Sequence, residues 1–160
     1  MTDRELINFL DIAEKMKCNI RHSWTSTNRK ESVAEHSWRL SLMALLLEKE
    51  IEGVDFQKII KMCIIHDLGE AITGDIPSFL KTEEDSKVEE NAIIELLETL
   101  PEPQKTDMLT LFEEMEQRQT MEAKIYKALD RLEAVIQHNE APISSWLPLE
   151  YDLQQTYGWE

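Results

Sequence analysis

The segment from Phe56 to Asp67 constrains the fold more than any other part of this chain. Its apolar side chains fall on almost every face of a helix, which is typical of a helix that is buried on most sides. They are Phe56, Ile59, Ile60, Met62, Cys63, Ile64 and Ile65. The run ends in His66 and Asp67, an imidazole and a carboxylate that both bind metals. The segment therefore predicts a central helix that carries two chemically active side chains to the edge of the core.

The remaining periodic segments also predict helices. Capping-box sequences, in which a hydroxyl and an acid three residues later bind backbone amides, begin two of them, at Ser32 and Thr82. The expected helices span about residues 2–17, 32–50, 55–67, 82–100, 104–117 and 120–139. Residues 18–30 show neither helical nor strand periodicity and are expected to form a loop. The predicted fold class is all-α, a bundle of about six or seven helices in a single domain over residues 1–160.

The C-terminal segment, from Ala141 onward, has a different composition. It contains two prolines and several aromatic residues, and we expect a short helix together with packed aromatic turns. The aromatic residues are Trp146, Tyr151, Tyr157 and Trp159.

Charge and cysteine content limit the possible partners. The chain has 32 acidic and 17 basic residues, and its formal charge of −15 repels nucleic acids and anionic membranes while it attracts divalent cations. Cys18 and Cys63 lie in unrelated segments, as expected for reduced thiols. The N-terminus lacks the pattern of a secretion signal, and no apolar run is long enough to span a membrane. We therefore expect a cytoplasmic protein that acts on a small molecule.

Four side chains from three predicted helices are candidate metal ligands: His36, His66, Asp67 and Asp130. His36 shares a helical face with Leu40 and Met43, so it is expected to point inward. Two imidazole nitrogens and two carboxylate oxygens suit a divalent transition ion and leave coordination positions for water. This pattern is typical of a catalytic metal site.

The same residues also have ordinary structural explanations. A single histidine on an apolar face is more often a hydrogen-bonded core residue than a ligand, and Asp130 has Lys127 and Arg131 nearby for an ion pair. Against this, a buried carboxylate at Asp67 is costly unless it is paired or binds a metal. Periodicity and spacing alone leave a metal site and a structural cluster as equal alternatives.

The order of His36, His66-Asp67 and Asp130 on an all-helical chain resembles the signature of the HD-domain metal-dependent phosphohydrolases. Longer segments resemble the 5′-deoxynucleotidase branch of this superfamily, namely Glu31–Ser37, His66–Pro77 and Lys127–Ala134. Arg21 and Trp24 also fit the pattern of that branch. The resemblance covers about Leu6–His138, whereas the residues after Asn139 have no clear counterpart.

The resemblance implies an HD-domain helical bundle, acting as a homodimer, that releases phosphate from deoxyribonucleoside 5′-monophosphates. It implies one divalent ion (Mn²⁺, Co²⁺, Fe²⁺ or Zn²⁺) bound by His36, His66, Asp67 and Asp130. Asp75 would orient or deprotonate the attacking water, and Glu70 would support the site and handle the proton of the leaving group. Arg21 would bind the phosphate and Trp24 would border the pocket.

Several alternatives remain open from the sequence. Glu70 also fits a solvated acid, Asp75 a turn residue and Trp24 a loop-packing residue. His22 is a candidate to assist Arg21, and His138 is expected at the surface. No histidine occurs between the HD pair and Asp130, which favours one metal over two. The alternative functions are hydrolysis of another nucleotide, such as a triphosphate or an alarmone, and a non-catalytic nucleotide-binding HD module.

Overall fold

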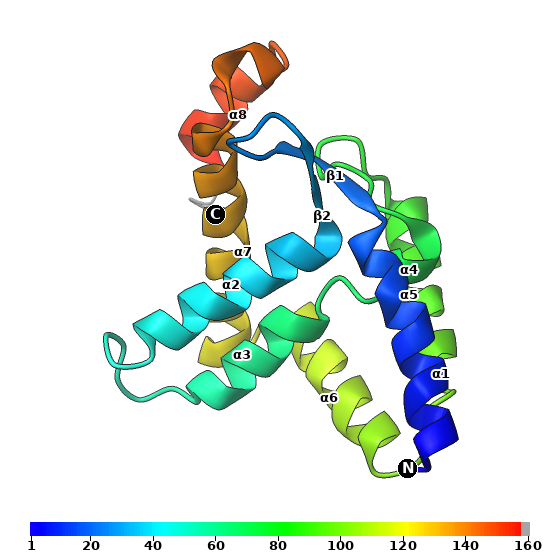
Figure 1. Cartoon of the computed structure of the whole chain (residues 1–160). Coiled ribbons are helices and arrows are strands. Elements are labelled where there is room, and N and C mark those ends of the chain that lie inside the picture. The colour runs from blue at the N-terminus through cyan, green and yellow to red at the C-terminus, as the bar shows by residue number, and fades with distance from the viewer. Residues whose placement is uncertain (158–160) are drawn as a thin grey trace.

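The computed structural model describes residues 1–157, and helices dominate them, which confirms the all-α prediction (Figure 1). The longest helices are α1 (Asp3–Ala13), α2 (Val33–Leu47), α3 (Phe56–Ile65), α5 (Glu83–Leu97), α6 (Gln104–Gln117) and α7 (Met121–Glu140). The shorter elements are the 3-10 helices η1 (Glu14–Lys17) and η2 (Ile143–Ser145) and the α-helices α4 (Glu70–Thr73) and α8 (Glu150–Thr156). None of the helices in residues 1–157 combines the length and the apolar character needed to cross a membrane.

Side-chain caps fix the beginnings of the two helices that lead into the site. The Ser32 hydroxyl accepts a hydrogen bond from the Glu35 amide, and the Glu35 carboxylate accepts one from the Ser32 amide at 2.8 Å. The Asp55 carboxylate accepts one from the Lys58 amide at 3.1 Å. These bonds satisfy amides that the first helical turn leaves unpaired, so the predicted starts of α2 and α3 are confirmed.

The core lies where α2 and α3 run side by side and α7 packs against both (Figure 1). Leu40 of α2 and Ile59 and Met62 of α3 are fully buried there. This confirms that α3 is the central helix. One of its faces nevertheless reaches solvent, because Ile64 is 53% exposed.

Residues 18–30 are not the loop that we expected. They contain strand β1 (Ile20–Trp24), which pairs antiparallel with β2 (Lys30–Ser32). The strands are short and their register is irregular between the two bridging pairs, so no alternation of apolar and polar residues appears in the sequence. The hairpin leads directly into α2, because β2 ends at Ser32 and α2 begins at Val33. The Val33 amide also donates to the Asn19 carbonyl at 3.0 Å, which ties the start of α2 to the start of the hairpin.

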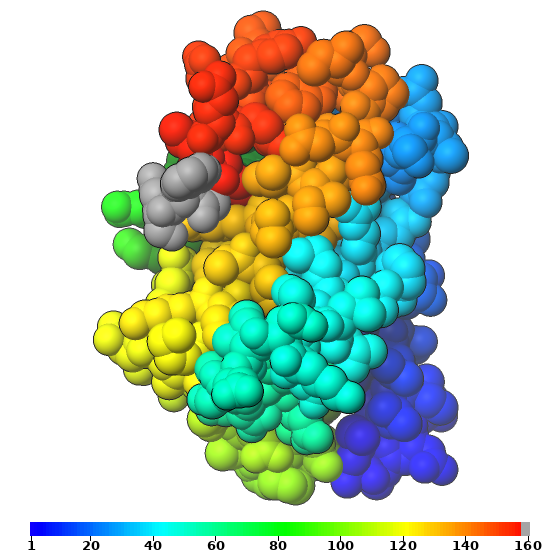
Figure 2. Space-filling model, turned by 90° about the vertical axis from the view of Figure 1, so that its left-hand side faces the viewer, coloured from blue at the N-terminus to red at the C-terminus, as the bar shows by residue number. Residues whose placement is uncertain are grey.

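The C-terminal segment folds back on the end of α7. Figure 2 shows this segment, in red, packed against the orange part of α7. It covers His138, whose ring centroid lies 4.3 Å from that of Trp146, so the expectation of a surface histidine is wrong. The short helix that we expected is α8. Trp159 lies outside the described residues.

Candidate metal and active site

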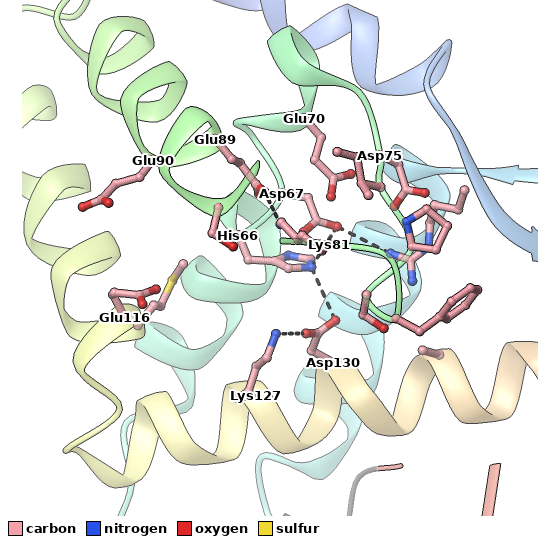
Figure 3. Close-up of a pocket in the computed structure, with 18 of the residues that line it drawn as sticks. His66, Asp67, Glu70, Asp75, Lys81, Glu89, Glu90, Glu116, Lys127 and Asp130 are labelled. Atoms are coloured by element: carbon pink, nitrogen blue, oxygen red, sulfur yellow. Dashed lines mark hydrogen bonds and ion pairs between the residues drawn. The ribbon is translucent and has the colours of Figure 1, made fainter. Parts of the chain in front are cut away.

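Three helices bring the four predicted ligands together. His36 lies in the first turn of α2, His66 caps the end of α3 with Asp67 directly after it, and Asp130 lies in the middle of α7. Figure 3 shows His66, Asp67 and Asp130 pointing toward one another. The capping box at the start of α2 and the end of α3 therefore set the positions of both imidazoles.

The donor atoms have the separations expected around one ion. His36 Nε2 lies 3.3 Å from His66 Nε2, 3.0 Å from Asp130 Oδ1 and 4.0 Å from Asp67 Oδ2. His66 Nε2 lies 3.1 Å from Asp67 Oδ2 and 3.6 Å from Asp130 Oδ1. Donors that share an ion at about 2.1 Å lie roughly 3.0 to 3.5 Å apart when they are adjacent and up to about 4.2 Å apart when they are opposite. The residues present therefore fit a divalent metal.

Charge in the cluster supports the same conclusion. Burial favours a neutral imidazole, yet the carboxylates of Asp67 and Asp130 raise the pKa of His66 to about 10. Burial also disfavours the Asp67 carboxylate, but His66 and His36 hold its pKa below the ordinary value. The acids thus attract positive charge to the point where the two imidazoles meet, and a divalent cation supplies such charge.

Arg21 approaches this cluster from β1. Its Nη1 lies 3.5 Å from Asp67 Oδ2 and its Nε lies 3.4 Å from Glu31 Oε2. Burial opposes its charge, but the carboxylates of Asp67 and Glu31 raise the pKa of Arg21 above the ordinary value. The hairpin that the sequence did not predict thus places a permanent cation beside the predicted metal ligands.

Glu70 and Asp75 lie on the other side of Asp67 (Figure 3). Glu70 begins α4 and is only 6% exposed, so it is not a solvated acid. Burial and the neighbouring carboxylates of Asp67 and Asp75 raise the pKa of Glu70 to about 9. Burial also raises the pKa of Asp75, which follows Gly74 at a positive φ of 78°. In the metal-free protein, the raised pKa of Glu70 favours its protonated form at neutral pH.

These groups line a cavity of about 930 Å³. Of the predicted site residues, those in its wall are Arg21, His66, Asp67, Glu70, Asp75 and Asp130. His36 is fully buried behind them. Trp24 is absent from the cavity wall formed by residues 1–157. The Lys30 ammonium lies 4.8 Å from the centroid of the Trp24 ring. The Trp24 carbonyl accepts a hydrogen bond from the Gln137 side chain at 2.6 Å.

The C-terminal segment forms the far wall of this cavity. His22 of β1 and His138 of α7 both contact the Glu150 carboxylate, at 2.8 and 3.4 Å. Phe79 adds an aromatic ring 5.7 Å from that of His22. All four residues line the cavity. His22 thus belongs to this aromatic and polar end.

A further acid, Glu133, was not singled out from the sequence. It is fully buried, and its carboxylate binds Nδ1 of His36. Its apolar neighbour Leu132 is 45% exposed, and Glu133 takes the inward position on α7. Its spacing of three residues from Asp130, one helical turn, is the signal that could have identified it.

The sequence profile of the HD domain matches residues 13–160 of this chain. The chain belongs to the HD-domain family. The match extends through the C-terminal segment, so the expectation that this segment has no counterpart is wrong.

Known HD-domain proteins similar to this chain include enzymes and solved structures. The 5′-deoxynucleotidase HDDC2 of Dictyostelium discoideum is 35% identical over 144 residues, which cover 84% of this chain and 76% of the relative. Its human counterpart is 32% identical over 141 residues, with coverages of 86% and 68%. The crystal structure of a predicted metal-dependent phosphohydrolase from Magnetospirillum magnetotacticum is 30% identical, with a TM-score of 0.78. The matched region covers 86% of this chain and 70% of that protein's chain. These likenesses confirm the predicted enzyme class, an HD-domain phosphohydrolase.

Proposed function

We propose that this chain hydrolyses deoxyribonucleoside 5′-monophosphates to nucleoside and phosphate. The observation that carries the proposal is the meeting of four ligand side chains at the wall of a cavity that is also lined by one arginine and two raised-pKa acids. The 5′-deoxynucleotidase names of relatives at 32 to 35% identity support the substrate class.

The proposed cofactor is one divalent ion, Mn²⁺, Co²⁺, Fe²⁺ or Zn²⁺, held by His36, His66, Asp67 and Asp130. Such an ion neutralises charge on phosphoryl oxygens and makes water more acidic. The convergence of two imidazoles with two low-pKa carboxylates supports this ligand set.

The chain's own residues supply the remaining chemistry. Arg21 binds the phosphate oxygens through its planar guanidinium. Asp75 accepts a proton from the attacking water as the new bond to phosphorus forms. The bond from phosphorus to the 5′ oxygen breaks, and Glu70, whose surroundings raise its pKa, donates a proton to that oxygen. Trp24 as a substrate contact stays a prediction.

The charges around the cavity favour a monophosphate over a triphosphate or an alarmone. Glu89 and Glu90 of α5 and Glu116 of α6 lie on the side away from Asp75 (Figure 3). Lys81 is in contact with Glu89, and Lys127 donates to Asp130 at 2.7 Å. Lys87 and Arg118 also line the cavity, but the acidic side chains in its wall outnumber the basic ones. Additional phosphates would meet carboxylates there. The pairing of His22, His138 and Glu150 with the Phe79 ring instead fits the nucleoside.

We also propose a cytoplasmic homodimer in which one domain, residues 1–160, acts on a small nucleotide rather than on nucleic acid polymers. An exposed apolar stripe on α2 supports the dimer. It consists of Trp38, Leu42, Leu45 and Leu46, which are 66, 38, 53 and 70% exposed. Contiguous apolar surface of this kind is typical of interfaces. Cys18 and Cys63 are free thiols, in keeping with a reducing compartment.

A phosphate-release assay of Mn²⁺-loaded protein tests the function. Deoxyribonucleoside and ribonucleoside mono-, di- and triphosphates and an alarmone form the panel. We expect the deoxyribonucleoside 5′-monophosphates to be hydrolysed fastest, and Asp67→Ala to abolish both metal binding and turnover. Asp107→Ala removes an exposed acid of α6 and serves as the matched control. A preference for triphosphates would contradict the substrate class, and absence of turnover in metal-replete protein would favour the non-catalytic HD module.

A further inference from the structure

The two imidazoles of the site are oriented by different partners. Nδ1 of His66 donates a hydrogen bond to the Cys63 carbonyl at 2.9 Å, within its own helical segment. Nδ1 of His36 instead bonds the carboxylate of Glu133, which belongs to α7. The opposite ring nitrogen of each histidine, Nε2, faces the proposed metal position. The orientation of His36 thus depends on an acid from another helix.

The position of Glu133 is itself fixed by Arg39. Arg39 Nε lies 3.2 Å from Glu133 Oε1, and Arg39 Nη1 donates to Gln137 Oε1 at 2.7 Å. Arg39 follows His36 by three residues on α2, and Gln137 follows Glu133 by four on α7, so each pair occupies one helical face. The guanidinium provides the charge that a fully buried carboxylate needs.

Glu31, Glu133 and His36 also place three possible ligand atoms within 4.8 Å of one another. A second metal there is disfavoured, because both carboxylates already face guanidinium groups. Glu31 Oε2 lies 3.4 Å from Arg21 Nε, and Glu133 contacts Arg39. The two acids therefore support different residues, Glu31 the arginine and Glu133 the histidine.

We propose that Glu133 is a positioning residue for the metal site. It accepts a hydrogen bond from Nδ1 of His36 and thereby holds the Nε2 lone pair toward the ion, while the contact with Arg39 holds the Glu133 carboxylate in place. Carboxylate partners of this kind fix the tautomer and orientation of a ligand histidine and increase its basicity. The inference rests on the proposed metal site but not on the proposed substrate.

Mn²⁺ titration calorimetry on substrate-free protein tests this role. Glu133→Met keeps a similar volume but removes the acceptor, and we expect Mn²⁺ affinity to fall by about 10- to 100-fold. Glu133→Gln restores an acceptor without charge and should recover part of the affinity. Glu31→Met is the matched control, since it alters a neighbouring buried acid that contacts Arg21 rather than His36. Equal losses in Glu31→Met and Glu133→Met, or wild-type affinity in Glu133→Met, would overturn the proposal.

A second measurement does not depend on any variant folding. In ¹⁵N NMR spectra of the Zn²⁺-loaded wild-type protein, we expect His36 to carry a slowly exchanging proton on Nδ1. A proton on Nε2, with the metal at Nδ1, would overturn the proposal. Both measurements omit nucleotide, so the substrate assay can fail while these succeed, and the two proposals remain distinguishable.

Discussion

The Nε2 atoms of His36 and His66 lie 3.3 Å apart, although the two residues come from different helices and are separated by thirty positions in the chain. Asp130 Oδ1 lies 3.0 Å from the first and 3.6 Å from the second. Two unprotonated Nε2 atoms this close to each other and to a carboxylate would repel one another. In the metal-free protein, a proton on at least one Nε2 atom therefore takes the place of a metal ion. Metal binding and proton release are consequently linked.

Mn²⁺ affinity should rise with pH. Burial opposes protonation of His66, but Asp67 and Asp130 raise its pKa to about 10, so below that pH the metal must displace a proton. We expect an increase of up to about tenfold per pH unit between pH 6.5 and 8, as one displaced proton requires. Calorimetric titrations in buffers of different ionisation enthalpy would count the released protons. An affinity that does not change with pH would show that His66 is already neutral before the metal binds.

Arg21→Gln should weaken substrate binding while metal binding remains. Loss of a charged hydrogen-bond donor to a phosphate costs about 1.5 to 3 kcal/mol, or roughly 10- to 100-fold in KM. Steady-state kinetics together with metal analysis would measure both effects. Arg29→Gln is the control on the same hairpin, because Arg29 is exposed and pairs with Glu35. Unchanged KM in Arg21→Gln would remove this residue from the phosphate site.

Glu70→Gln should lower kcat by about 10²- to 10⁴-fold, because an amide cannot donate the proton that the leaving oxygen requires. Retention of wild-type kcat would show that the carboxyl group has no part in proton transfer. The same variant also tests how the stability of the protein depends on pH.

Stability of the metal-free protein should respond to pH through Glu70. Burial and the acids Asp67 and Asp75 raise its folded pKa to about 9, whereas an unfolded glutamate titrates at 4.5. The folded state therefore binds the extra proton, and this contribution to stability is complete below pH 4.5 and is lost as pH rises toward about 9. Urea unfolding at pH 5 and pH 8 should show a smaller decrease for Glu70→Gln than for the wild type. Equal decreases in the two proteins would contradict the raised pKa.

Much of the site could be predicted from the sequence because its ligands lie at positions that helical periodicity determines. His36 follows a capping box by one residue and was expected to point inward, and His66 ends an apolar helix and was expected at the edge of the core. Both are buried. Their meeting depends on how the helices pack, which periodicity does not encode. The family resemblance supplied that step.

The errors have a common physical cause, since each concerns residues whose environment is set by distant segments. Arg21 lies on a strand that forms only by pairing with β2. His138 is buried by Trp146 and Glu150 of the C-terminal segment. Glu133 occupies an inward position that an acid can take only because Arg39 of α2 faces it. The periodicity of a single segment gives no information about partners that come from distant segments.

Gly69→Ala should destabilise the protein, because a Cβ at this position would lie 2.8 Å from Ile93 Cγ1 and 2.9 Å from Glu89 Cγ. Gly69 is buried against α5, so we expect a loss of about 1 to 3 kcal/mol in the free energy of unfolding. Chemical denaturation would measure it. Wild-type stability would indicate that α5 can shift away without cost.

An anomalous difference map from crystals grown with Mn²⁺ tests the central claim most directly. We predict one peak, about 2.0 to 2.3 Å from Nε2 of His36, Nε2 of His66 and one carboxylate oxygen each of Asp67 and Asp130. A peak between Glu31 and Glu133, or no peak at the four ligands in Mn²⁺-saturated crystals, would contradict it.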